Sequence, residues 1–113
     1  MSFNTIIATP NFQTEAKRLV KKYSSLKTEF AELFQQLEAN PTLGTSIGKS
    51  LYKIRLAVRS KGKGKSGGLR IVTYAIQKNE FGYSVYLLTV YDKSEEATID
   101  KEELEKIVRS IIA

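Results

Sequence analysis

The stretch LYKIRLAVRSKGKGKSGGLRIVTY, residues 51–74, decides the fold and carries most of the charge. Apolar and polar residues alternate over residues 52–58, and an apolar run follows at 69–76, as in strands of a sheet. The intervening SKGKGKSGG has four glycines, which disfavour a helix and a strand interior. The stretch therefore predicts a β-hairpin with a lysine-rich loop.

The positive charge of the chain is concentrated in this hairpin. Residues 49–78 contain nine lysines and arginines and no acidic residue, whereas the whole chain has a net charge of +6. The first 48 residues have five basic and four acidic side chains, and the last 35 have four basic and eight acidic ones. A local cluster of this kind indicates a polyanionic partner. Nucleic acid fits it, as would an anionic membrane surface or an acidic protein.

Composition limits the chemistry that the chain can perform. Its 113 residues suit a single domain, 1–113, and contain neither cysteine nor histidine. Disulfides and thiolate chemistry are excluded, and the commonest acid–base catalyst and metal ligand is missing. No apolar run is long enough to span a membrane, and the N-terminus lacks the features of a signal peptide. We expect a soluble, cytoplasmic protein that uses no metal or other cofactor.

The first half of the chain predicts a strand and two helices. Residues 3–8 form a short apolar run, and Thr9 and Pro10 then provide an N-cap and a first-turn proline for a helix to about Tyr23. A second apolar stripe at helical spacing ends before Pro41. The two helices should form an antiparallel hairpin whose apolar faces pack against a sheet.

The second half predicts the remaining elements. Residues 43–50 contain two glycines without periodicity and are interpreted as a loop, whereas 83–91 predicts a central strand covered on both faces. Asp100 with Glu103 forms a capping box, and Ile99 is spaced as a hydrophobic staple with the leucine five residues later. The order β-α-α-β-β-β-α predicts a small α+β domain with a mostly antiparallel sheet and an N-terminal helical hairpin.

The hairpin strands supply the first candidate site. Lys53 and Arg55 are two residues apart on one strand, so they project from the same face about 7 Å apart. In the simplest register Arg70 enters the partner strand near the loop. Three converging cations could clamp a phosphate and stabilise a phosphorane-like transition state. Solvent-exposed cations that discourage aggregation are an equally good interpretation of Lys53 and Arg55.

The loop and its shoulder supply candidate RNA-backbone ligands. Arg59, Lys61, Lys63 and Lys65 follow one another through the glycine-rich segment. Such cations bind phosphates without reading sequence, and they would be solvated in the free protein.

The end of the last strand is the second candidate site. Tyr91, Lys93 and Glu95 place a phenol, an ammonium and a carboxylate close together in sequence. These groups can act as acid, base or phosphate ligand without a histidine. From the pattern alone, a polar turn between a strand and a helix is the favoured interpretation.

The elements and their motifs together resemble a known family. YKIRLA, GKGKSGGLRIVTY and LLTVYDKSE, in this order, are similar to the RelE/ParE superfamily of bacterial toxin–antitoxin toxins, and more so to its RelE/HigB branch. The similarity spans nearly the whole chain, including F-x3-AKRL-x-KKY and NP-x2-G. It implies a RelE-like fold and a toxin held by an antitoxin in a hetero-oligomer. It also implies a metal-independent endoribonuclease that cuts mRNA in the A site of the 70S ribosome and leaves a 2′,3′-cyclic phosphate.

The resemblance also implies roles for particular residues. Lys53 and Arg55 match the basic strand residues of the family, and Arg70 matches the arginine after the hairpin turn. Lys93 matches a cation after the last strand, and Tyr91 belongs to the Y-x-K-x-E variant of that motif.

One position departs from the family pattern. A tyrosine implicated in RelE catalysis aligns with Ile99, which leaves the general base open, with Tyr91, Lys93 or Glu95 as substitutes. Two alternatives follow: a ParE-like toxin that binds DNA gyrase without nuclease activity, and a catalytically weakened family member.

Overall fold

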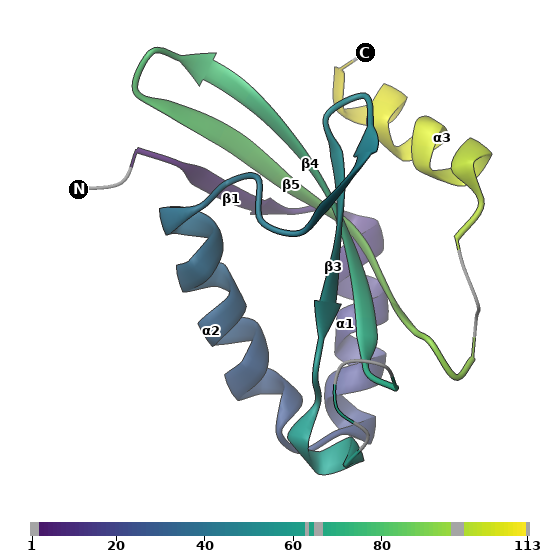
Figure 1. Ribbon diagram of the computed structural model, residues 1–113. Helices are drawn as coiled ribbons and strands as arrows, with labels where there is room; N and C mark the ends of the chain where they lie inside the picture. Colours follow the sequence, from purple (N-terminus) through teal and green to yellow (C-terminus); the bar gives the residue numbers. More distant parts are fainter. Residues whose placement is uncertain (1–2, 63, 65–66, 96–98, 113) are drawn as a thin grey trace.

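The computed structural model describes residues 3–62, 64, 67–95 and 99–112. It is a five-stranded sheet with helices on both faces (Figure 1). The elements are β1 (Thr5–Ala8), α1 (Pro10–Lys22), α2 (Leu26–Ala39), β2 (Thr45–Gly48), β3 (Leu51–Leu56), the short 3-10 helix η1 (Arg59–Lys61), β4 (Leu69–Asn79), β5 (Gly82–Asp92) and α3 (Lys101–Ile112). The predicted α+β class is confirmed.

The sheet has the strand order β1-β5-β4-β3-β2. β1 is parallel to β5, and every other pair is antiparallel, as the mostly antiparallel prediction requires. The predicted hairpin is β3 and β4, with Leu56 opposite Leu69 where the loop begins and ends. The long strand β5 is central, between β4 and β1.

The prediction of a loop over residues 43–50 was wrong, because β2 lies within it. Thr45 and Ser46 pair with Lys53 and Tyr52, and the pairing then shifts register toward Gly48. Four residues with a bulge are too short to show a period of two. Gly44 is needed where the chain passes β3, because a Cβ there would lie 2.5 Å from the Lys53 carbonyl oxygen.

Helix α1 begins where the sequence predicts, and both N-terminal helices end where it predicts. Thr9 caps α1 by accepting a hydrogen bond from the Phe12 backbone N–H at 3.2 Å, with Pro10 as the first helical residue. Tyr23 ends α1, and Asn40 ends α2. No helix in the described part of the chain is both long and apolar enough to cross a membrane.

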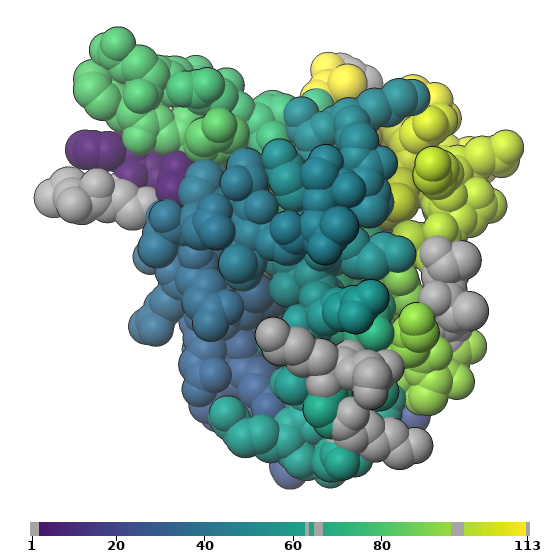
Figure 2. Space-filling view, viewed as in Figure 1, coloured from purple at the N-terminus to yellow at the C-terminus, as the bar shows by residue number. Residues whose placement is uncertain are grey.

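Each face of the sheet has its own apolar core. The larger core lies between the sheet and the helical hairpin α1–α2, and it includes Leu19, Leu33 and Leu87. The smaller core lies under α3, where Leu104 packs with Leu51, Val72, Leu88 and Tyr91. Figure 2 shows β2 and β3 between α2 (blue) and α3 (yellow). β5 is therefore covered on both faces, as predicted.

The start of α3 follows its sequence signals. The Asp100 carboxylate accepts a hydrogen bond from the Glu102 backbone N–H at 3.0 Å, and α3 begins at Lys101. Ile99 packs in the same core as Leu104, as a hydrophobic staple does. These contacts attach α3 to the face of the sheet that carries the candidate site.

Candidate phosphate-binding site

Three candidate residues lie in one row across the sheet. Arg55 on β3 is directly opposite Arg70 on β4, and Arg70 is directly opposite Tyr91 on β5. Residues paired in this way project from the same face of a sheet. We call Arg55, Arg70 and Tyr91 the strand row. Lys53 is two residues from Arg55 on β3, so it lies on the same face, which is also the face that α3 covers.

The members of this face differ in their access to solvent. Arg55 is exposed and Lys53 is half-buried. Arg70, expected to be a phosphate ligand, is only 3% exposed, and its Nη1 donates to the Leu69 carbonyl oxygen at 3.2 Å. Tyr91 is 5% exposed. Arg55 and Lys53 are therefore more accessible to solvent than Arg70.

A buried carboxylate next to the strand row escaped the sequence analysis. Asp92, the last residue of β5, is 1% exposed and accepts hydrogen bonds from the Tyr23 hydroxyl and the Lys61 ammonium. The Ser94 backbone N–H and hydroxyl also donate to it, at 2.9 and 2.7 Å. We call Tyr23, Lys61, Asp92 and Ser94 the Asp92 cluster. Its members come from three distant parts of the chain, so no local pattern indicated it.

The Asp92 cluster shifts the acidity of its members. Burial alone would raise the pKa of Asp92, but the hydrogen bonds from Lys61, Tyr23 and Ser94 outweigh it and lower the pKa below its ordinary value. The hydrogen bond to the Asp92 carboxylate, together with burial, raises the pKa of Tyr23 to about 12. Asp92 is therefore ionised and Tyr23 protonated at neutral pH.

The candidate RNA ligands of the loop differ from one another in the structure. Lys61 has a side chain only 9% exposed and forms an ion pair with Asp92, so it is not the solvated loop cation that we expected. Arg59 is exposed but lies near two α2 carboxylates, 3.6 Å from Glu29 and 3.7 Å from Glu32. Lys63 and Lys65 lie outside the described residues.

The two candidate residues that follow β5, Lys93 and Glu95, lie in different surroundings. Lys93 is exposed, and its backbone N–H donates to the Gly68 carbonyl oxygen at 3.3 Å. Glu95 forms ion pairs with Arg18 at 3.1 Å and Lys22 at 3.9 Å, both on α1. The structure thus places Tyr91 in the strand row, with Lys93 two residues further along the chain, and directs Glu95 toward α1.

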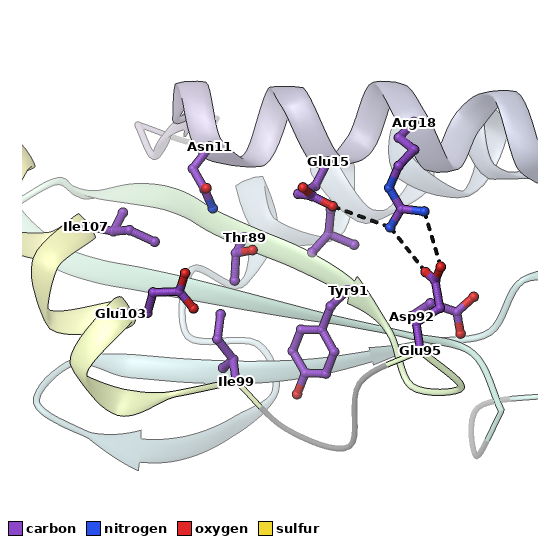
Figure 3. A pocket seen from close by; sticks show the side chains of 11 residues that line it. Asn11, Glu15, Arg18, Thr89, Tyr91, Asp92, Glu95, Ile99, Glu103 and Ile107 are labelled. Atoms are coloured by element: carbon purple, nitrogen blue, oxygen red, sulfur yellow. Dashed lines mark hydrogen bonds and ion pairs between the residues drawn. The ribbon is translucent and has the colours of Figure 1, made fainter.

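A cleft of about 230 Å³ lies beside the end of β5, between α1, β5 and α3, and Tyr91 of the strand row is one of its lining residues. Figure 3 shows Arg18 between Glu15 and Glu95, with Glu103 across the cleft. The lining contains four carboxylates and one arginine (Glu15, Asp92, Glu95, Glu103 and Arg18). Because a phosphate would be repelled by these carboxylates, the cations Lys53, Arg55 and Arg70, which do not line the cleft, are the better candidates for an anionic ligand.

A mixed five-stranded sheet between a helical hairpin and a C-terminal helix places the protein in the class of small α+β domains. No protein-family model matches the chain. Its structure is similar to that of E. coli toxin RelE, solved in the free state as a mutant with two arginines replaced by alanine. The TM-score is 0.60, with 18% sequence identity over 98% of this chain and 99% of that chain. The predicted RelE-like fold is therefore confirmed.

Proposed function

We propose that this protein is the toxin of a type II toxin–antitoxin pair and that it acts as an endoribonuclease on mRNA in the ribosomal A site. The observation that carries the proposal is the strand row, which aligns two arginines and a tyrosine on one sheet face, with Lys53 beside them. Cations at this spacing suit the successive phosphates of a nucleic acid. The RelE-like fold and the sequence motifs support the same activity.

The proposed reaction needs only the RNA and protein side chains. The ribose 2′-oxygen forms a bond to the adjacent phosphorus while the bond to the 5′-oxygen breaks. The 2′-hydroxyl proton passes to a base, and the departing 5′-oxygen gains a proton, so the products are a 2′,3′-cyclic phosphate and a 5′-hydroxyl. Lys53 and Arg55 stabilise the charge that develops on the phosphate oxygens, supported by Arg70.

Two candidates remain for proton transfer. Glu95 is engaged by two cations of α1, which makes it the weakest of the three residues suggested by the sequence. Tyr91 lies in the strand row and Lys93 follows it closely. We propose that one of these two accepts the 2′-hydroxyl proton, since Ile99 is part of an apolar core.

An antitoxin has a suitable surface on the opposite side of the sheet. A groove between α1 and α2 is lined by apolar side chains that include Phe12, Val20 and Phe34, and by three lysines, Lys17, Lys21 and Lys27. The residues that line it include no carboxylate. An antitoxin segment with an apolar stripe and acidic flanks fits this groove by shape and charge.

The test is to map the 5′ ends of cellular messages after brief induction of the toxin without its antitoxin. We expect cuts within codons for the natural chain and at least about tenfold fewer cuts for Arg55→Ala, since charge stabilisation in a transition state is worth this much or more. Arg109→Ala is the matched control, because Arg109 is an exposed arginine on α3.

Three outcomes would contradict the proposal. Undiminished cuts with Arg55→Ala would exclude the assigned role of that arginine. Intact messages with accumulated DNA–gyrase complexes would support the ParE-like alternative, which the isoleucine at position 99 motivates. Normal growth without the antitoxin would indicate a catalytically weakened protein.

A further inference from the structure

We infer that Asp92 is a positioning residue for the strand row. We also infer that Lys61 is not an RNA ligand but an anchor, which attaches the start of the lysine-rich loop between η1 and β4 (the basic loop) to the end of β5. The inference rests on the proposed function only for its effect on RNA. The contacts themselves are independent of that function. It assigns a role to a buried charged cluster that the proposed reaction does not use.

The Asp92 carboxylate joins three elements. One oxygen accepts from Tyr23, the residue that ends α1, and the other accepts from Lys61 in η1. Ser94, just after β5, donates to Asp92 with both its backbone N–H and its hydroxyl. The Lys61 ammonium also lies 5.6 Å from the centre of the Tyr23 ring. The cluster therefore fixes the end of β5 against η1 and α1.

The turn formed by η1 also makes hydrogen bonds to the first part of α2 and its N-cap residue. The Ser60 backbone N–H donates to the Ser25 hydroxyl at 3.0 Å, and the Ser25 backbone N–H donates to the Ser60 hydroxyl at 3.3 Å. The Arg59 backbone N–H donates to the buried Glu29 carboxylate at 2.7 Å. The segment that leads into the basic loop is thus attached on two sides before Gly62.

The other end of the loop, at Gly68, is attached to the residue that follows β5. Lys93 donates its backbone N–H to the Gly68 carbonyl oxygen. Only glycine fits at position 68, because a Cβ there would lie 2.1 Å from the Leu56 carbonyl oxygen. Both ends of the loop are consequently bonded to the end of β5: Lys61 to Asp92, and Gly68 to Lys93.

This arrangement couples the Asp92 cluster to the strand row. Asp92 is directly opposite Leu69, and its chain neighbour Tyr91 is directly opposite Arg70. Since successive residues of a strand point to opposite faces, fixing Asp92 on one face fixes Tyr91 on the other. Loss of the cluster should therefore displace Tyr91 and Lys93 relative to Arg55 and Arg70.

The charge of Lys61 leads to a separate expectation. Its side chain is only 9% exposed, and its ammonium is paired with the Asp92 carboxylate. A lysine that binds an RNA phosphate releases a counterion and contributes to the salt dependence of binding, whereas an internally paired one does not. Lys61 and the exposed Lys93 can thus be distinguished by experiment.

The first experiment compares Lys61→Met with Lys93→Met by native-state hydrogen exchange at a temperature where circular dichroism shows both variants folded. We expect amides of Ser60, Lys61 and Gly62 to exchange about tenfold faster in Lys61→Met, because a local anchor is lost. Amides in the interior of β4 should keep their protection. Lys93→Met should leave the turn unchanged. Unaltered exchange of the turn in Lys61→Met would overturn the anchor.

The second experiment measures binding of a fluorescein-labelled single-stranded RNA over a range of salt concentrations. Lys93→Met should lower the slope of log affinity against log salt by about 0.7, the contribution of one phosphate contact, whereas Lys61→Met should keep the slope of the natural chain. A slope lowered by the same amount in Lys61→Met would show that Lys61 contacts RNA and would overturn our assignment.

The positioning role is tested by single-turnover cleavage of messages on programmed ribosomes. Asp92→Asn and Lys61→Met should each lower the cleavage rate of the folded protein about tenfold, and the double variant should be no slower than Asp92→Asn, because Lys61 acts through its ion pair with Asp92. Multiplied effects, or a cleavage rate unchanged in folded Asp92→Asn, would overturn it. Tyr23→Phe removes a single hydrogen bond and should have the same effect to a smaller degree, even if Asp92→Asn fails to fold.

These experiments distinguish a wrong nuclease assignment from a wrong assignment of the Lys61 anchor. If the natural chain neither binds RNA nor cuts messages, the nuclease assignment is wrong and the positioning role is lost with it. Faster exchange of the turn in Lys61→Met would then still establish the anchor.

Discussion

The two faces of the sheet at the end of β5 arrange their charged side chains in opposite ways. On the face toward α1 and α2, the Asp92 carboxylate meets donors from Tyr23, Lys61 and Ser94. On the face toward α3, Arg55 and Arg70 are directly opposite each other. Like charges at opposite positions destabilise a sheet. The first arrangement surrounds a carboxylate with hydrogen-bond donors, whereas the second places two cations opposite each other, where a polyanion would be attracted.

Removing the Asp92 carboxylate should have the largest effect. Asp92→Ala leaves the Lys61 ammonium buried without its partner, and breaking a buried ion pair in this way costs about 3–5 kcal/mol. The free energy of unfolding from urea titration checks this value. Asp100→Ala is the matched control and should cost only about 1 kcal/mol, as the loss of a helix cap does. Equal losses in the two variants would contradict the importance of the Asp92 cluster.

Removing the Tyr23 hydroxyl should have an intermediate effect. Tyr23→Phe removes one hydrogen bond to a charged group, worth about 1.5–3 kcal/mol. Because the pKa of Tyr23 is raised to about 12, the unfolded chain ionises first as the pH rises above about 10. The stabilisation is complete below pH 10 and should be lost as the pH approaches 12.

Urea titrations of both proteins between pH 8 and pH 12 measure this difference. The advantage of the natural chain over Tyr23→Phe should shrink across the upper part of that range. An advantage that is constant with pH would show that the Tyr23 hydroxyl is not coupled to the Asp92 carboxylate.

Relieving the repulsion in the strand row should have the smallest effect, and of opposite sign. Arg55→Gln should raise the free energy of unfolding by about 0.2–1 kcal/mol, because one of two opposed cations is removed. The same variant should bind single-stranded RNA more weakly. Thermal unfolding and RNA titration of one protein sample measure both quantities. A loss of stability would show that Arg55 is compensated within the fold.

The sequence motifs that predicted the elements correctly are all local. Thr9 with Pro10 began α1, Asp100 began α3, and alternation marked β3. Local signals failed where pairing was decided at a distance. β2 is too short to show a period, and it forms because its backbone pairs with β3.

The sequence by itself determined the helices, the hairpin and the cationic segment, because periodicity, capping and charge are properties of neighbouring residues. Only the tertiary structure decided which of those cations are exposed and which are buried. Lys61 and Tyr23 lie 31 and 69 positions from Asp92 in the chain, and their pairing depends on how the helical hairpin packs on the sheet. For the same reason the sequence could not separate the buried Arg70 from the exposed Arg55: burial is set by what covers a residue, and that cover comes from elsewhere in the chain.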